Sequence, residues 1–509
     1  MHVAVTRFAQ GGFFWGMSAS PQKRTLASVL LGANLRLSEL AEPFYYGCQI
    51  WQNDQPIKRY CEIIVNSYNL NMKRMMAITA LSLILSSCVN SPYSTLSSGT
   101  SSATIQKPTL DRSLTDLQNL NVGNMQFATD IYQKLSQDPE KQGENIFISP
   151  LSISTAFGLA YAGSKGSTAR EMASVLQYNL PESRLHPAMK ELLSLAEDQG
   201  EGQVFNTANA LFVEKTTVLE PDYVAITDTY YNAADTRVNF KSAPKAAIDT
   251  INDWVKEKTR GLIPKTLTFT KDTYKTRNVM VNTAYLKANW SRPFSEGRTE
   301  IGEFTTPSEV IKTPLMHLTS KLPYVKNKGY ASVILPYQGG AMSMVAILPD
   351  RPDGLPKLEA KLTPEFIDIL MEGFKKDYET TKPYKVDLTL PKIDLSDDYK
   401  LAPTLKAMGM IQAFSDFADF SGRIVAAKQP DGYPTRLGQV IHKTVLKVDE
   451  AGTEAAAVTA IDEIIVSGAP RHKPKIVEFK ADHPFLILIR HNETGAILFM
   501  GRINKPASK

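Results

Sequence analysis

The stretch that decides the fold is Glu450-Ala-Gly-Thr-Glu-Ala-Ala-Ala-Val-Thr-Ala-Ile-Asp-Glu-Ile-Ile-Val-Ser467, near the end of a chain of 509 residues. In an extended conformation its side chains alternate between two faces. One face carries small or β-branched residues: Thr453, Ala455, Ala457, Thr459 and Ile461. From Glu450 no proline interrupts the chain until Pro470, so each residue of the stretch keeps the amide that a central strand needs. Gly452 supplies a hinge. We interpret the stretch as a strand that is not yet in a sheet.

Local propensity favours another interpretation of the same stretch, a helix, because alanine is the strongest helix former. The neighbouring sequence decides between the two. Upstream, Val440-Ile-His-Lys-Thr-Val-Leu-Lys-Val448 is typical of a strand. The combination of His442 with a hinge segment resembles the reactive-centre loop region of serpins, the serine protease inhibitor superfamily. The hinge residues that carry this resemblance are Glu450, Gly452, Thr453, Ala455, Ala456 and Ala457.

The resemblance to serpins extends from about Asn124 to Pro506. Its further motifs are Asn145–Ser154, Asn282–Trp290 with Pro293-Phe294, Leu335–Tyr337 with Ile347–Pro349, Leu405–Phe414, and Asp482–Phe485 with Phe499–Arg502. It implies the serpin fold, a mixed three-sheet core with surrounding helices and an exposed reactive-centre loop. The order of the predicted elements also argues for the α+β class, because strands and helices do not alternate strictly.

Alternating and continuous apolar runs predict the individual strands. The predicted strands are 279–286, 332–337, 342–349, 385–391, 440–448, and a buried hairpin of 485–489 with 496–500. The first helix of the domain shows Phe127, Ile131 and Leu135 at four-residue spacing, which predicts one buried stripe.

The same resemblance implies that the protein is a suicide inhibitor of serine proteases. A protease cleaves the loop, the loop inserts into the central sheet, and the acylated protease is trapped. The resemblance implies a polar cluster beneath the sheet, called the shutter, and an entry point, called the breach. The shutter residues are Ser149, Ser152, Asn282 and His442, and Trp290 lies at the breach.

The family position of the cleaved bond falls between Val466 and Ser467. A β-branched residue there favours an elastase- or subtilisin-like protease. Arg471, followed by His472, is a second candidate that favours a trypsin-like enzyme. Because a serpin supplies no nucleophile, the covalent bond is expected to be an ester to the serine of the protease. We expect a monomer and assign no cofactor, and whether a polyanion speeds the reaction stays open at this point.

Two other functions remain open at this point. One is a non-inhibitory serpin-fold protein that binds a partner or acts as a chaperone without trapping a protease. The other is an acyl-transfer enzyme, because Ser242-Ala-Pro-Lys245 fits the Ser-x-x-Lys pattern. The chain lacks the partner motifs of such enzymes, and Pro244 sits inside the turn that the nucleophile would open. We therefore expect no catalytic residue.

Composition and charge exclude several classes of function. The net charge is +5 without a long basic block, so nucleic-acid binding has no support from charge. The seven histidines are scattered, and no metal-ligand spacing or phosphate loop occurs. With 43% hydrophobic and 21% charged residues, the chain can bury a sizeable core.

The stretch from Met72 to Cys88 has the order of a bacterial secretion signal: a charged start, an apolar run, and small residues before cysteine. Leu85-Ser86-Ser87-Cys88 resembles the lipobox of bacterial lipoproteins, which implies lipidation of Cys88. The apolar run is shorter than the ~20 residues that a transmembrane helix needs. The sequence therefore predicts a lipid anchor as the only membrane attachment, and a location in the cell envelope or outside the cell.

These features divide the chain into four parts. Residues 1–71 form a leader that we expect to lie upstream of the natural start at Met72, because a secretion signal works at a free amino terminus. Residues 72–87 are the signal peptide, and residues 88–109 are the lipidated cysteine with a Ser/Thr-rich tether. Residues 110–509 are expected to form the domain that resembles serpins. Cys48 and Cys61 lie in the leader, so no disulfide is expected in the domain.

Overall fold

The structure is a computed structural model that describes the chain between residues 111 and 506. The described ranges are 111–197, 203–231, 237–261, 263, 265–271, 273–380, 384–425, 436–453 and 475–506. They belong to the second of two units into which the chain divides, Ala103–Lys509. No helix within these ranges is both long and apolar enough to cross a bilayer. The predicted leader, signal peptide and tether lie outside the described residues.

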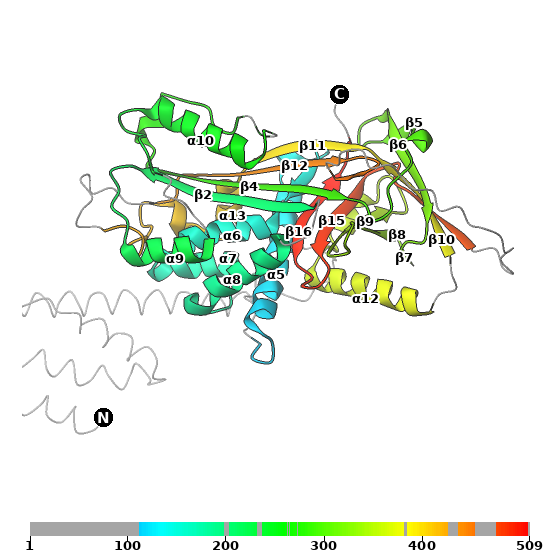
Figure 1. Ribbon diagram of the computed structural model, residues 1–509, viewed down its shortest axis with the longest axis horizontal. Coiled ribbons are helices and arrows are strands. Elements are labelled where there is room, and N and C mark those ends of the chain that lie inside the picture. The colour runs from blue at the N-terminus through cyan, green and yellow to red at the C-terminus, as the bar shows by residue number, and fades with distance from the viewer. Residues whose placement is uncertain are drawn as a thin grey trace, which may run out of the picture. The chain divides into compact units, whose positions relative to one another are not determined.

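Helices surround the sheets on more than one side (Figure 1). They are α5 (Asp116–Ser136), α6 (Pro150–Tyr161), α7 (Gly166–Val175), α8 (Glu182–Glu197), α9 (Pro221–Tyr231), α10 (Pro244–Lys258), α11 (Leu355–Glu359), α12 (Pro364–Thr380) and α13 (Leu401–Ala407). The helix α6 packs under strands β2 and β4, whereas α10 lies on the opposite face of the same sheet. The predicted stripe of Phe127, Ile131 and Leu135 lies on α5 and is buried, which confirms that prediction.

One of the two six-stranded sheets contains the predicted hinge and is called the large sheet below. In order across the sheet its strands are β11 (Ile393–Lys400), β12 (Gln439–Val448), β13 (Gly452–Thr453), β4 (Asn278–Asn289), β2 (Val204–Glu214) and β3 (Arg237–Val238). Strand β12 also pairs directly with β4, in parallel, away from β13. The large sheet therefore has two kinds of contact between the same two strands, one direct and one through β13.

Two further sheets complete the core. A second six-stranded sheet has the order β1 (Ile146–Ile148), β16 (Ile497–Ile503), β15 (Phe485–His491), β9 (Met342–Pro349), β8 (Tyr330–Pro336) and β7 (Tyr324–Asn327). A four-stranded sheet has the order β14 (Lys475–Lys480), β10 (Tyr384–Pro391), β6 (Val310–Ser320) and β5 (Glu300–Thr305). Three sheets with separate helices confirm the predicted α+β class.

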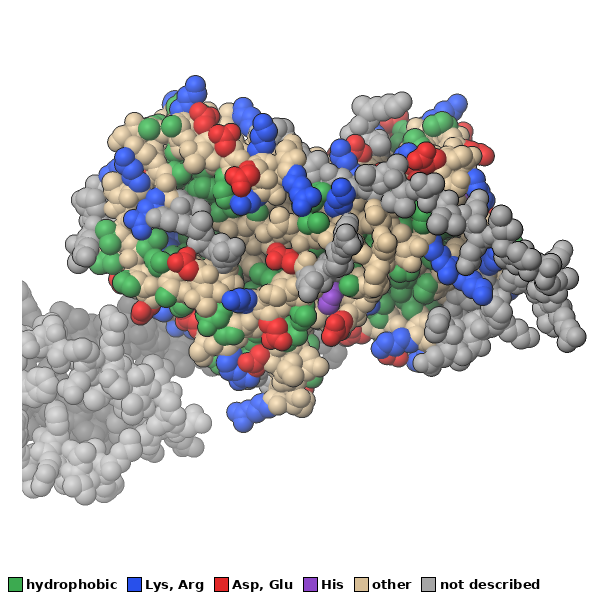
Figure 2. Space-filling view, viewed as in Figure 1, with side chains coloured by type: hydrophobic (Ala, Val, Ile, Leu, Met, Phe, Trp, Pro, Cys, Tyr) green, Lys and Arg blue, Asp and Glu red, His purple; other side chains and the backbone are tan. Residues whose placement is uncertain are grey.

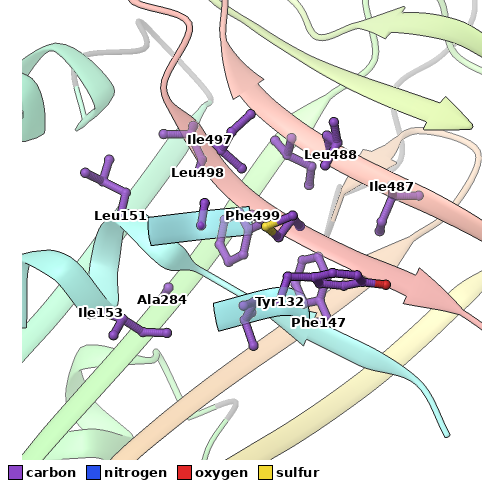
Figure 3. Close-up of a cluster of buried hydrophobic side chains, with 14 of the residues drawn as sticks. Tyr132, Phe147, Leu151, Ile153, Ala284, Ile487, Leu488, Ile497, Leu498 and Phe499 are labelled. Carbon is purple, nitrogen blue, oxygen red and sulfur yellow. The ribbon is translucent and has the colours of Figure 1, made fainter. Parts of the chain in front are cut away.

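The core lies where β1, β15 and β16 meet α5, α6 and the large sheet (Figure 3). Phe147 stacks on Phe499 with ring centroids 5.0 Å apart, and Phe205 from the large sheet meets Phe499 edge-on at 5.6 Å. Both strands of the predicted hairpin are almost entirely buried, because they are covered on both faces. The core therefore ties the large sheet to the sheet beneath it.

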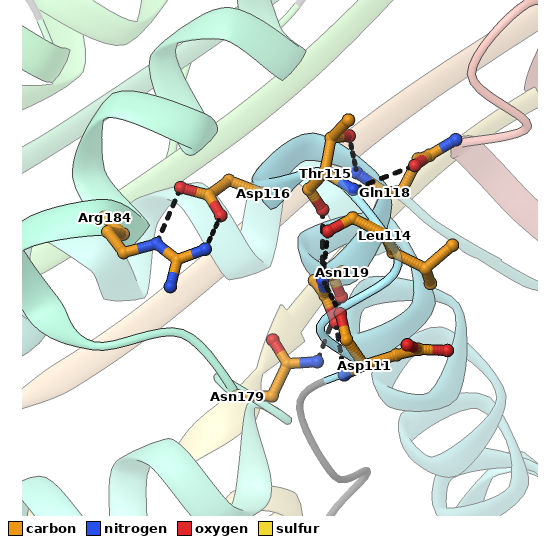
Figure 4. A network of polar contacts seen from close by, with 8 residues as sticks. All are labelled: Asp111, Leu114, Thr115, Asp116, Gln118, Asn119, Asn179 and Arg184. Carbon is orange, nitrogen blue, oxygen red and sulfur yellow. Dashed lines mark hydrogen bonds and ion pairs between the residues drawn. The ribbon is translucent and has the colours of Figure 1, made fainter.

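The first described helix begins with a capping box. The Thr115 side chain accepts from the Gln118 amide, and the Gln118 side chain accepts from the Thr115 amide (Figure 4). Asp116 in the first turn pairs with Arg184 of α8, and its charge complements the helix dipole. These contacts hold the first turn of α5 in place against α8.

Candidate functional site

The hinge residues Gly452 and Thr453 form β13 and lie inside the large sheet. Thr453 pairs with Val448 of β12 on one side and with Ala288 of β4 on the other. The interpretation of this stretch as a strand outside any sheet is therefore wrong for Gly452 and Thr453. It failed because one of the two flanking strands, β4, is distant in sequence, and no local pattern encodes that pairing. Residues 454–474 lie outside the described ranges.

A tight turn brings the chain from β12 into β13. The Asp449 carboxylate accepts from the amides of Ala451 and Gly452 at 2.9 and 3.1 Å, and the Asp449 amide donates to the Gly452 carbonyl at 2.9 Å. A Cβ atom at residue 452 would overlap the Ala288 carbonyl oxygen. Glycine is therefore required for residue 452 to lie this close to β4.

Glu450 anchors the same turn to two other parts of the fold. Its carboxylate lies 2.7 Å from Lys392 Nζ and accepts from the Thr299 hydroxyl at 2.6 Å. Burial alone would raise the pKa of Glu450, but the hydrogen bonds from Lys392 and Thr299 lower it below its ordinary value. The carboxylate is thus charged at neutral pH and holds the end of β12 in place.

Trp290 lies directly beside the hinge. Its amide donates to the Ala451 carbonyl at 2.9 Å, and its indole Nε1–H donates to the Asp449 carbonyl at 3.0 Å. Its ring stacks on Tyr337 with centroids 4.5 Å apart, and the Tyr337 hydroxyl lies 2.8 Å from the Thr453 hydroxyl. The structure therefore brings the predicted breach residue against the hinge.

The four predicted shutter residues lie together beneath the parallel pairing of β12 and β4. His442 and Asn282 are opposite each other in that pairing, and their side chains are hydrogen-bonded. The Ser149 amide donates to His442 Nε2 at 3.0 Å, so Nδ1 carries the proton and donates to Asn282. The Asn282 amide group donates in turn to the Ser152 hydroxyl at 2.6 Å. All four residues are almost completely buried.

The shutter connects the large sheet to the core. The Ser149 hydroxyl donates to the Leu498 carbonyl of β16 at 2.6 Å, and the Thr444 hydroxyl of β12 donates to the Phe147 carbonyl of β1 at 2.6 Å. Because these groups are buried, separating β12 from β4 requires their hydrogen bonds to be exchanged rather than lost. The arrangement can hold the sheet closed until another strand supplies new partners.

Burial of His442 predicts how acid acts on stability. Complete burial lowers the pKa of His442 to about 3 from an ordinary value of 6.5. Between these values the unfolded chain binds a proton that the native state does not, so stability falls as the pH drops from about 6.5 towards 3. We expect the melting temperature to fall between pH 7 and pH 4, and to fall less in the variant His442→Gln, measured by calorimetry. Equal falls in both proteins would contradict this role of His442.

Several predicted site residues lie outside the described ranges. They are Ala455, Ala456, Ala457, Val466, Ser467, Arg471, His472 and Cys88. Among the described residues, no group of three His, Cys, Asp or Glu side chains could hold a metal ion. Ser242 and Lys245 of the enzyme alternative are both exposed at the start of α10.

Sequence reasoning missed some contacts of this site. It assigned no role to Lys392, Thr299 or Asn209, although Asn209 of β2 accepts from Asn282. It used Tyr337 only as part of a family motif. Each of these side chains reaches the site from a distant segment, and hydrophobic periodicity carries no signal for such contacts.

Comparison with known proteins agrees with this geometry. The family profile described as "Serpin (serine protease inhibitor)" matches residues 122–506. An uncharacterised serpin-like protein of Thermococcus kodakarensis is 36% identical over 383 residues, covering 75% of this chain and 84% of that protein. The leukocyte elastase inhibitor of Bos taurus is 35% identical over 402 residues, covering 77% of this chain and 100% of that protein.

A solved structure shares the same architecture. The crystal structure of human glycosylated kallistatin superposes with a TM-score of 0.67 at 28% identity, covering 78% of this chain and 100% of that chain. The fold predicted from the resemblance is thereby confirmed. The family profile spans most of the chain and includes the hinge, the shutter residues and Trp290. This chain belongs to the serpin family.

Proposed function

We propose that the protein is an irreversible inhibitor of serine proteases that works by inserting its cleaved loop into the large sheet. The observation that carries this proposal is β13, because Gly452 and Thr453 already lie between β12 and β4. Below β13 the two strands pair directly over Gln439–Thr444 and Val279–Ala284. A longer strand replaces that parallel pairing with two antiparallel ladders, which are slightly more stable per residue.

The register of Thr453 predicts the partners of the inserted strand. Each step along the loop moves one residue back along both β12 and β4. On the inner face the resulting triplets are Leu446–Ala455–Leu286, Thr444–Ala457–Ala284 and His442–Thr459–Asn282. Alanine fits this face because the strand enters above a packed core, where a large side chain would clash.

The triplet His442–Thr459–Asn282 explains why the shutter residues are polar. Inserting a strand between His442 and Asn282 breaks the hydrogen bond between them. The Thr459 hydroxyl can both donate and accept, so it can pair with both side chains in the new position. The exchange leaves no buried group without a partner, which lowers the barrier to insertion.

We propose that the protease cleaves between Val466 and Ser467 and remains attached by an ester to its own serine. Support comes from the relative named leukocyte elastase inhibitor and from the β-branched residue at position 466. An elastase- or subtilisin-like target is therefore favoured. The bond after Arg471 is the second candidate, and it favours a trypsin-like target.

We also propose that the domain is displayed at a membrane surface through lipidated Cys88. This rests on the sequence of residues 72–88 alone. On the face seen in Figure 2, positive and negative side chains are interspersed, which gives a membrane surface no continuous basic patch to bind.

The test is to mix the full-length protein with pancreatic elastase, subtilisin and trypsin, and to run denaturing gels. We expect a band that resists boiling at the summed mass, and a released peptide that begins at Ser467 by mass spectrometry. A peptide that begins at His472 would keep the mechanism and move the cleaved bond. Cleavage without a stable complex would contradict the proposal and leave a serpin fold that binds a partner without trapping a protease.

A further inference from the structure

Tyr337 is held rigidly beside the hinge. It directly follows β8, its amide donates to the Met342 carbonyl at 3.1 Å, and its backbone forms a bridge with Trp290. Stacking on the indole at 8° between ring planes fixes the orientation of its phenol ring. The hydroxyl is therefore directed to one place, the Thr453 hydroxyl at 2.8 Å.

Both residues of this hydrogen bond, Tyr337 and Thr453, are buried from solvent. Tyr337 and Thr453 are each 0% exposed, and burial raises the pKa of Tyr337, so the phenol stays protonated. A buried hydroxyl that loses its partner is not resolvated, and this makes loss of the bond unfavourable. If Thr453 left the sheet, the Tyr337 hydroxyl would lose this bond in a buried position.

We propose that Tyr337 is a positioning residue for loop insertion, whose hydroxyl holds Thr453 in the large sheet before any protease arrives. This inference rests on the proposed inhibitory function and extends it. When a strand is added to a sheet, the first residue pairs cost the most conformational entropy. They fix the chain before the hydrogen bonds of the later pairs have formed. Trapping requires the cleaved loop to insert faster than the protease hydrolyses the ester. Because the hinge is already paired on both sides, formation of the first pairs no longer slows insertion.

The hydrogen bond also explains the residue at position 453. Valine has nearly the same shape as threonine and suits a strand, but it offers no hydroxyl. The site therefore selects threonine through Tyr337. Removing either hydroxyl alone leaves the other unpaired, whereas removing both leaves two apolar groups in contact, which is nearly neutral.

Because the loss of one hydroxyl differs from the loss of both, the interaction can be tested by a double-mutant cycle. The variants are Tyr337→Phe, Thr453→Val and the two combined. The matched control is Tyr330→Phe, which removes a buried phenol hydroxyl bonded to Asn327 elsewhere on β8. All variants are made in the full-length protein. Two quantities are measured: hydrogen exchange of peptides spanning 285–290 and 446–453, and the number of inhibitor molecules consumed for each elastase molecule trapped.

We expect each single variant to exchange roughly tenfold faster at these peptides and to consume more inhibitor per trapped protease. The combined variant should return towards the wild type in both quantities, and Tyr330→Phe should leave both unchanged. A residue that only supports the fold would not show this recovery. Unchanged exchange in Tyr337→Phe, or effects that add in the combined variant, would overturn the proposal. If the wild type traps no elastase, the proposed function fails, and the exchange cycle alone decides whether Tyr337 holds the hinge.

Discussion

Replacing Thr453 with arginine should abolish formation of the covalent complex and turn the protein into a substrate of its target. Thr453 is fully buried between β12 and β4, and its hydroxyl meets that of Tyr337. A guanidinium at this position would be desolvated without a counter-charge, which costs several kcal/mol. The cleaved loop would then fail to insert before the protease hydrolyses the ester. We expect at least a roughly 100-fold loss of complex on denaturing gels, since each 1.4 kcal/mol is about tenfold.

The matched control is Thr453→Ser, which keeps the hydroxyl and should retain most of the complex. In Thr453→Arg the loop should still be cleaved, so the released peptide should appear at the normal rate. A stable complex in the arginine variant would mean that residue 453 does not need to enter the sheet. The loss of complex together with continued cleavage separates failed insertion from failed recognition.

The second large effect is expected from Asn282→Ala. This change leaves the buried His442 Nδ1–H and the Asn209 side chain without the partner that Asn282 provides, and it removes a donor to Ser152. Each buried donor or acceptor left without a hydrogen-bond partner lowers the stability by about 1–3 kcal/mol. We expect the free energy of unfolding to fall by roughly 3 kcal/mol, measured by urea denaturation.

The same change should weaken the closure of β12 on β4. Amides of 279–284 and 439–444 should therefore exchange faster than in the wild type, even at temperatures where the protein remains folded. Asn206→Ala is the matched control, because this asparagine lies on neighbouring β2 with a partly exposed side chain. Equal exchange and equal stability in the two variants would contradict the role of Asn282 in holding the sheet closed.

Much of the fold could be predicted because its signals are local. The stripe of Phe127, Ile131 and Leu135 has helical periodicity, and the runs at 485–489 and 496–500 are continuously apolar because both faces are covered. Asn282 and His442 could be assigned to one cluster only through the family resemblance. Either residue alone carries no such signal in its own segment.

The state of the hinge could not be predicted, because it depends on contacts between distant segments. Thr453 meets Tyr337 across 116 residues, and Glu450 meets Thr299 across 151 residues. Local propensity even favours a helix for the alanine-rich stretch. Insertion of a strand depends on the difference in free energy between the closed large sheet and the sheet with an added strand. That difference is a property of the whole domain and not of the stretch itself.

The most direct test of insertion is the melting temperature of the protein after its loop is cut by thermolysin. Thermolysin is a metalloprotease that forms no ester to a serine, so cleavage between residues 454 and 466 releases the loop without attaching an enzyme. Insertion along β12 and β4 adds two ladders of hydrogen bonds, and we predict a rise of roughly 20 °C. Amides of 279–284 and 439–444 should exchange more slowly after the cut. A melting temperature that stays the same or falls after cleavage would contradict the inhibitory mechanism.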